Sequence, residues 1–281
     1  MKIYKFMIRL LFAIGIVAAF IFGGCTPSAK QQLAETISQD ISLSVVDSMA
    51  RATIREGFNA GSGYSQIWAR DMNTFIEVAC EENDTEEIRS AILLFFALQQ
   101  SNGEMIDGYV LKEDFTWYDD TPYYSEAAPK HVAFKNTVET DQETSLIQIV
   151  GKYIRKTGDR SILEEEIAGR TVSERIEEMV NYLMREQDSA QEERYKKRFD
   201  EKYGLLYGAM TADWGDVQPN DDFGCDMNEL SHAAIDVYDN AMFIIALDYL
   251  VELYPEEADR QKWQQLRERI AGNVRKHLWD A

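Results

Sequence analysis

Four short clusters of acidic and aromatic residues stand out because their side chains could bind and cleave a sugar. They are Trp68-Ala69-Arg70-Asp71, Glu139-Thr140-Asp141-Gln142, Asp213-Trp214-Gly215-Asp216 and Tyr238-Asp239-Asn240. Aromatic rings stack on the apolar faces of sugar rings, and carboxylates accept hydrogen bonds from sugar hydroxyls. A pair of carboxyl groups can also supply the acid and the base that cleavage of a glycosidic bond requires.

The cluster Asp213-Trp214-Gly215-Asp216 is the one best suited to catalysis. Its two carboxylates flank an indole ring, and Gly215 allows the backbone to turn tightly. A general acid needs a carboxyl group whose pKa is raised by an apolar wall or by a neighbouring negative charge. Trp214 could supply the wall and the second aspartate the charge, so Asp213 and Asp216 are the predicted catalytic residues. The alternative is an aspartate-rich surface turn.

Two of the clusters begin long helical runs. In the first, Trp68 precedes Arg70 and Asp71, and its indole ring offers a platform for a sugar. In the second, Glu139 and Asp141 lie together at the helix start. A carboxylate at this position is stabilised by unpaired backbone amides and by the helix dipole. Capping and surface ion pairs are therefore the alternative to a role in sugar binding, although capping explains one acid better than several.

The last cluster is expected inside an apolar helix. Tyr238, Asp239 and Asn240 are surrounded there by alanine, valine, isoleucine, methionine and phenylalanine. Polar side chains on a buried helix cost free energy unless they are paired. We therefore expect Asp239 and Asn240 to face a polar cavity, with a hydrogen-bonded pair in the core as the alternative.

Apolar residues at helical spacing dominate the rest of the chain. The helices are expected at about residues 33–58, 70–81, 84–100, 139–157, 162–168, 172–186, 228–254 and 255–279. Residues 101–138 are predicted to form a long aromatic loop, with a short hairpin as an alternative, and residues 188–202 a charged helical face or connector. No alternating segment is long enough to predict a sheet. The expected fold class is all-α, built from recurring helix pairs.

The N-terminus has the features of a sorting segment. Three basic residues precede an apolar run over residues 10–22, and Phe22-Gly23-Gly24-Cys25 resembles the lipobox of bacterial lipoproteins. Residues 1–24 are predicted to be a signal peptide, Cys25 a lipidated N-terminus and residues 25–32 a tether. Residues 33–281 would then form one domain in the cell envelope, outside the cytoplasm. An ordinary signal peptide or anchor helix with an incidental cysteine is the alternative.

Composition narrows the class of partner. The chain has 29 basic and 49 acidic side chains, and removing Lys2, Lys5 and Arg9 with the signal segment changes the net charge from −20 to about −23. This charge argues against nucleic acid as a partner and is compatible with neutral sugars. The three histidines are far apart and the remaining cysteines, Cys80 and Cys225, form no ligand motif, so no metal or other cofactor is predicted.

In their order along the chain, these clusters resemble the six-hairpin glycosidases, which are α/α-toroid enzymes of glucoamylase-like, trehalase-like and processing-glucosidase-like families. The resemblance covers about residues 50–281. It is carried by Ile67-Trp68-Ala69-Arg70-Asp71, Val138-Glu139-Thr140-Asp141-Gln142-Glu143, Thr211-Ala212-Asp213-Trp214-Gly215-Asp216 and Tyr238-Asp239-Asn240-Ala241. It implies a toroid of helical hairpins whose active site lies at the N-terminal ends of the inner helices. It also implies an inverting mechanism with two carboxyl groups roughly 6.5–9.5 Å apart.

By position, Trp68, Arg70 and Asp71 match the motif that grips the terminal sugar, and Asp213 matches the general acid, with Asp216 as the second choice. The sequence predicts only eight or nine helical segments and ends just after one of them, so we expect a partial toroid here. The general base of these families commonly comes from the late part of the barrel, which would then be missing. The expected function is hydrolysis of an oligosaccharide. The alternatives are a carbohydrate-binding lipoprotein or a truncated enzyme without its base, and more remotely a sugar lyase or epimerase.

Overall fold

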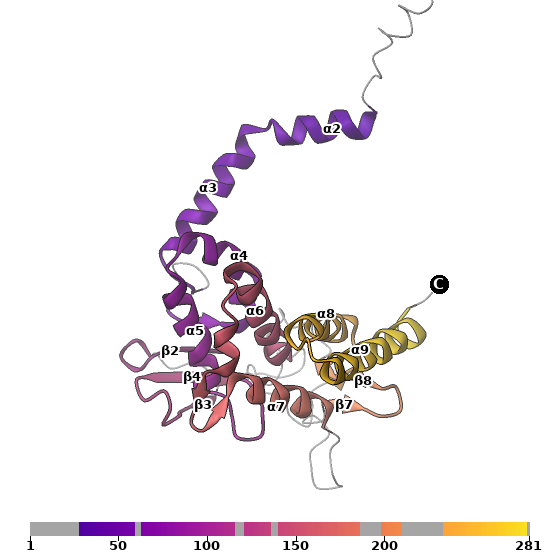
Figure 1. Ribbon diagram of the computed structural model, residues 1–281. Coiled ribbons are helices and arrows are strands. Elements are labelled where there is room, and N and C mark those ends of the chain that lie inside the picture. The colour runs from indigo at the N-terminus through magenta and orange to yellow at the C-terminus, as the bar shows by residue number, and fades with distance from the viewer. Residues whose placement is uncertain are drawn as a thin grey trace, which may run out of the picture. The chain divides into compact units, whose positions relative to one another are not determined.

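The computed structural model describes residues 28–59, 63–115, 121–135, 140–185, 198–209 and 233–279, and these residues are mostly helical (Figure 1). The α-helices are α2 (Ala29–Ser38), α3 (Ile41–Arg55), α4 (Ala69–Glu82), α5 (Thr85–Ala97), α6 (Gln142–Thr157), α7 (Val172–Met184), α8 (Val237–Leu253) and α9 (Glu257–His277). Two short 3-10 helices are η1 (Lys112–Asp114) and η2 (Arg160–Glu164). The prediction of a mainly helical chain is confirmed.

The chain divides into two compact units, residues 1–50 and 51–281. In the first unit, every described residue is exposed. The single helix expected over residues 33–58 is two helices, because Asp40 interrupts it. The Asp40 carboxylate accepts a hydrogen bond from the backbone amide of Ser42 at 2.9 Å, which starts α3 afresh.

In the second unit, α4 and α6 are parallel neighbours. Near their N-terminal ends, Nη1 of Arg70 lies 3.6 Å from Oδ1 of Asp141. Further along, the Lys152 ammonium donates to the backbone oxygen of Asn73 at 2.6 Å. Near their C-terminal ends, Lys156 forms an ion pair with Glu81 of α4. Because early residues contact early residues and late ones contact late ones, the two helices run in the same direction.

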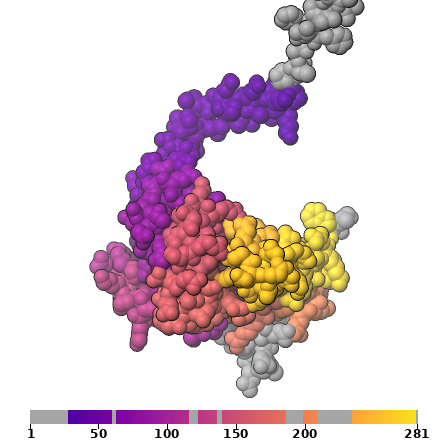
Figure 2. All heavy atoms as spheres, viewed as in Figure 1, coloured from indigo at the N-terminus to yellow at the C-terminus, as the bar shows by residue number. Residues whose placement is uncertain are grey.

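Helix α8 lies parallel to α6 on its other side. At the N-terminal ends, the hydroxyl of Tyr238 donates to Oδ2 of Asp141 at 2.9 Å. At the C-terminal ends, Arg155 forms an ion pair with Glu252 at 2.9 Å. In the space-filling view, the yellow segment that holds α8 and α9 packs against the rose segment that holds α6 (Figure 2). The alternate helices α4, α6 and α8 therefore bring their N-terminal ends to one side.

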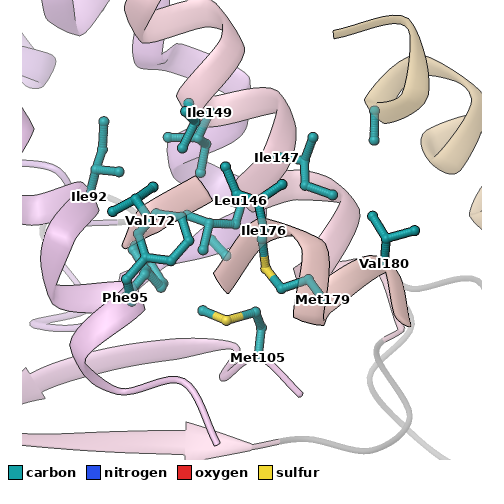
Figure 3. Close-up of a cluster of buried hydrophobic side chains, with 14 of the residues drawn as sticks. Ile92, Phe95, Met105, Leu146, Ile147, Ile149, Val172, Ile176, Met179 and Val180 are labelled. Carbon is teal, nitrogen blue, oxygen red and sulfur yellow. The ribbon is translucent and has the colours of Figure 1, made fainter. Parts of the chain in front are cut away.

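The intervening helices cover this array through apolar side chains. Figure 3 shows Ile92 and Phe95 of α5 and side chains of α7 gathered around α6. All the labelled residues are at most 2% exposed: Ile92, Phe95, Met105, Leu146, Ile147, Ile149, Val172, Ile176, Met179 and Val180. Full burial of such a side chain stabilises a fold by about 1.5–3 kcal/mol. Helix α9 packs along α8, with Trp263 and Ile270 buried.

A four-stranded antiparallel sheet occupies the region expected to be an aromatic loop. Its strands are β1 (Ile67–Trp68), β2 (Gly108–Leu111), β3 (Thr121–Tyr123) and β4 (His131–Lys135), in the order β1-β2-β4-β3. One face carries Val110, Val132 and Phe134 in a small cluster, whereas Tyr109 and Ala133 join the main core on the other face. Because β2 and β4 are buried on both faces, they lack the alternation that would have predicted them.

Three other expected elements differ from the prediction. The helix expected over residues 162–168 is η2 followed by a hairpin of β5 (Glu166–Ile167) and β6 (Arg170–Thr171). Ala168 and Gly169, which join these strands, both have a positive φ, as tight hairpin turns require. Within the charged stretch expected over residues 188–202, Phe199–Asp200 is a strand (β7) that pairs with Leu205–Leu206 (β8). Helix α8 starts at Val237 instead of residue 228, after β10 (Ala233–Ala234), which pairs with β9 (Gly208–Ala209).

We predict that Gly151→Ala destabilises the fold by about 1–3 kcal/mol, because overpacking strains a filled core. Gly151 lies in α6 where the ring of Tyr249 approaches the backbone, and a β-carbon there would lie only 2.6 Å from Cγ of that ring. The free energy of unfolding in urea measures the effect.

Gly272→Ala in α9 is the matched control, since a β-carbon at Gly272 would meet nothing within 4 Å. The control should stabilise the protein by roughly 0.5–1 kcal/mol, as alanine does in a helix. Equal effects of the two changes would contradict the close packing of α6 and α8.

Candidate functional site

Three of the four sequence clusters meet at the N-terminal ends of α4, α6 and α8. Trp68 is the N-cap residue of α4, Asp141 that of α6, and Tyr238–Asn240 fall in the first turn of α8. The last cluster lies inside a helix as predicted, but in its first turn, because α8 starts at Val237 instead of near residue 228. Asp236 caps α8 by accepting a hydrogen bond from the amide of Asp239 at 2.8 Å, so that the helix begins there.

The remaining predicted residues lie outside the described residues. They are Cys25, Glu139, Asp213, Trp214 and Asp216. Their assigned roles stay predictions. Cys225 also lies outside the described residues.

Asp141 joins the three helix starts. Its side chain is 1% exposed, and its two oxygens face Arg70 of α4 at 3.6 Å and the hydroxyl of Tyr238 of α8 at 2.9 Å. Although Asp141 occupies the N-cap position, its carboxylate makes no capping hydrogen bond with α6. A buried carboxylate needs a cation and hydrogen-bond donors to offset the loss of water. Asp141 therefore links neighbouring helices instead of capping its own.

Asp239 and Asn240 are also buried and hydrogen-bonded. The Thr140 hydroxyl donates to Oδ2 of Asp239 at 2.6 Å. The Asn240 side chain accepts from the amide of Leu206 at 2.9 Å and donates to its carbonyl at 3.1 Å, so it pairs with β8 as a strand would. A β-carbon on Gly208 would lie 3.1 Å from Cγ of Asp239 and would overlap its carboxylate. For Asn240, these bonds match the alternative prediction, a hydrogen-bonded side chain in the core instead of one facing a polar cavity.

Trp68 and Asp71 are only partly buried. The indole ring of Trp68 packs on Phe134 with the ring centroids 5.9 Å apart, and a β-carbon on Gly108 would lie 2.8 Å from Cε3 of that indole. Burial raises the pKa of the Asp71 carboxyl, and the neighbouring Arg70 opposes the shift. Of the described site residues, Trp68, Asp71 and Tyr238 are the partly exposed ones, whereas Arg70, Asp141, Asp239 and Asn240 are buried.

A second polar layer, which sequence reasoning missed, lies beside Gln142. The buried ammonium of Lys135, at the end of β4, donates to Oε1 of Gln142 at 3.2 Å. It also lies 3.8 Å from Oε1 of Glu104 and 3.9 Å from Oδ1 of Asp107. The amide of Gln142 donates to Asp107 as well. The one signal in the sequence was a lysine that directly follows the apolar residues Val132, Ala133 and Phe134.

The same layer extends to Tyr182 and Arg198. The hydroxyl of Tyr182 donates to Oε1 of Glu104 at 2.8 Å, and the buried guanidinium of Arg198 lies 5.9 Å from the Tyr182 ring centre. Burial alone would raise the pKa of Glu104, but Lys135, the Tyr182 hydroxyl and Arg198 together hold it below its usual range. For Arg198, burial favours a lower pKa, but Tyr182 and nearby carboxylates outweigh it and raise the value.

Glu143 completes this layer. Its Oε1 accepts a hydrogen bond from the amide of Met105 at 2.7 Å. The side chain has no solvent exposure, and its Oε2 has no hydrogen-bond partner in the part of the chain that the structure describes. This acid therefore supports the segment before β2.

Neither a metal site nor a membrane span is found among the described residues. No group of three or more His, Cys, Asp or Glu side chains in these ranges is arranged to hold a metal ion. No helix within them is both long and apolar enough to cross a membrane.

Comparison with models of protein families gives no match for this chain, and comparison with curated proteins gives none either. The functional assignment consequently depends on the chemistry and arrangement of the residues.

We predict that Glu104→Gln destabilises the protein at pH 7 by about 1–3 kcal/mol, because a partly buried charge-assisted hydrogen bond is lost. The pKa of Glu104 in the folded state lies below its usual 4.5. Its ionised form therefore stabilises the fold above pH 4.5, and this contribution disappears as the pH falls through the lowered value. The difference in the free energy of unfolding between wild type and variant should therefore shrink as the pH falls. Urea unfolding at pH 7, 5 and 3 measures it.

Glu113→Gln serves as the control, since Glu113 is exposed. It should change the stability at pH 7 by less than about 0.5 kcal/mol. A pH-independent difference between wild type and Glu104→Gln would show that the charge of Glu104 is not what stabilises this layer.

Proposed function

We propose that this protein is a glycoside hydrolase of the α/α-toroid class, acting on an oligosaccharide with a pocket at the N-terminal ends of α4, α6 and α8. The observation that carries the proposal is the Arg70–Asp141–Tyr238 contact, which joins three parallel helix starts. A toroid of helical hairpins has this order, with alternate helices in an inner ring and the others outside. Helices α5, α7 and α9 would form the outer ring.

The described residues divide into two roles in this proposal. Trp68 and Tyr238 supply aromatic faces for a sugar ring, and the partly exposed Asp71 accepts hydrogen bonds from its hydroxyls. The helix starts are held in place from the buried side by Arg70, Asp141 and Asp239, because these side chains are buried and paired. Trp68 is supported by a rigid sheet, which favours a fixed platform.

In the proposed reaction, Asp213 protonates the oxygen of the leaving group while a second carboxylate removes a proton from the attacking water. The water then attacks the anomeric carbon from the opposite face, which inverts its configuration. Asp216 lies beside Asp213 in sequence and is the second choice for the acid. The strongly negative chain suits a neutral substrate better than an anionic one.

A carbohydrate-binding lipoprotein is the second proposal, and one observation favours it. Asp141 and Asp239, two of the carboxylates near the proposed pocket, are buried and engaged with Tyr238 and Thr140. They are therefore poorly placed to activate water. A protein that retains the pocket without a second catalytic carboxylate would bind a sugar and leave it intact.

We also propose that Cys25 is acylated and attaches the protein to a membrane of the cell envelope. In a bacterial host, Cys25→Ala should abolish incorporation of labelled palmitate and release the protein from the membrane fraction, because the acylated side chain is gone. Cys80→Ala is the control and should retain the label, since Cys80 lies in α4. Label that persists in Cys25→Ala would contradict the anchor.

We predict that Asp213→Asn lowers hydrolysis by at least about 100-fold, since general acid catalysis contributes roughly 100- to 10,000-fold. Sugar binding should persist, because the Trp68 platform is unchanged. Release of reducing sugar from a panel of glycosides measures the first effect, and calorimetric titration with the same sugars measures the second.

Trp68→Ala is the complementary variant and should weaken binding by about 1 kcal/mol, as loss of an aromatic contact does. If Asp213→Asn retained hydrolysis, the general-acid role would be assigned to Asp216 or to another residue. Wild-type protein that binds a sugar without cleaving it would favour the binding proposal.

A further inference from the structure

The solvent-facing side of α5 carries an elongated groove, distinct from the helix starts described above. Two open cavities of about 550 and 740 Å³ adjoin at Ser90 and Leu94, which line both, and together they are here called the α5 groove. Its lining comes from α5, β1, β2 and the β5–β6 hairpin, with Glu86 near one end and Ala97 near the other.

The shape of the α5 groove fits a chain segment. It follows α5 from Glu86 to Ala97, which at about 1.5 Å per residue corresponds to roughly 17 Å. That length matches about three turns of a partner helix, which is how amphipathic helices bind in grooves.

The floor of the groove is apolar. Ile67, Leu94 and Leu111 contribute aliphatic side chains, and Leu111 is 40% exposed. The hydroxyl of Tyr109 is already bonded to the carbonyl of Ala91 at 3.0 Å, so that ring adds no free polar group. A floor of this kind favours the apolar side chains of a partner over a sugar, whose hydroxyls would lose water without gaining hydrogen bonds.

The rim of the groove is acidic. Among the residues that the structure describes, five carboxylates and no lysine or arginine line it: Glu86, Glu87, Asp114, Glu126 and Glu166. Arg89, on the same helix, is engaged by Glu165 at 2.6 Å. Burial and the nearby Lys130 lower the pKa of His131, so this lining imidazole adds little positive charge to the acidic rim.

We infer that the α5 groove docks a segment of a partner protein that carries apolar side chains on one face and lysine or arginine on its flanks. The apolar floor provides burial, and the acidic rim provides complementarity that steers a basic partner and fixes its orientation. The inference does not depend on the proposed glycosidase function.

The groove also lies behind the proposed sugar platform. Ile67 lines it, and the next residue of β1, Trp68, points to the opposite face of the strand because side chains alternate along a strand. A docked segment would therefore press on the strand that holds the indole ring.

The test uses a synthetic 14-residue helical peptide of leucine and lysine with one leucine face, and a matched peptide in which every lysine is glutamate. Calorimetric titration of the whole protein at 50 mM salt should show one site for the lysine peptide and at least tenfold weaker binding of the glutamate peptide. Affinity should fall as salt is raised to 300 mM, because the rim charges are screened.

Leu94→Arg should weaken binding of the lysine peptide at least tenfold, because it places a charge on the apolar floor. Glu87→Lys should weaken the same binding about threefold or more, because it reverses a rim charge. The control is Ile245→Arg, an equally drastic change at an exposed residue of α8, and it should leave the affinity unchanged. Circular dichroism confirms that each variant is folded.

Equal affinity of Leu94→Arg and Ile245→Arg for the peptide would overturn the proposal, as would equal binding of the two peptides to the wild type. Binding of phosphatidylcholine vesicles that is lost in Leu94→Arg but not in Ile245→Arg would assign the groove to a lipid surface and also overturn it.

Discussion

Removing a carboxylate from water costs free energy unless a cation and hydrogen-bond donors replace its solvent shell, and Asp141 is a carboxylate with such partners. Its partners, Arg70 and Tyr238, come from helices on either side of α6. The starts of α4, α6 and α8 must therefore remain in register, since displacement of any one would leave a buried charge uncompensated. The polar layer of Lys135, Glu104 and Gln142 continues this requirement toward the sheet. The arrangement of the candidate site follows from it.

Apolar packing keeps these polar contacts dry. Side chains of α5 and α7 close over α6, and none of those labelled in Figure 3 is more than 2% exposed. On the opposite side, Gly151 permits the Tyr249 ring to lie against the α6 backbone, which sets the spacing of α6 and α8. Within such a low-dielectric surrounding, the ion pairs and hydrogen bonds at the helix starts are stronger than they would be in water. The apolar core and the polar junction therefore depend on each other.

Helices with a continuous apolar face were predictable from the sequence, and α4, α5 and α7 begin within about two residues of their expected positions. The sheet was not, because β1 to β4 are at most five residues long and the central pair is buried on both faces. The start of α8 was expected near residue 228, because apolar residues continue on both sides of Asp236. Asp236 instead caps the helix, which begins at Val237. Sequence reasoning selected Trp68, Asp141 and Tyr238 as candidates, and the structure places all three at helix starts. Sequence reasoning could not show that Lys135 and Glu104 lie close together, since only the fold brings such distant charges together. The catalytic assignment of Asp213 and Asp216 remains a prediction.

The absence of a side chain at Gly108 has a consequence for how the platform would work. The indole of Trp68 lies against the backbone of β2 on one side and near Phe134 on another, so few of its rotamers are open to it before any ligand arrives. Immobilising a freely rotating side chain on binding costs about 0.5–1.5 kcal/mol. A ring that is already fixed avoids most of this entropy loss. In the proposed pocket, the packing of one glycine in a neighbouring strand would thus contribute to sugar affinity without touching the sugar.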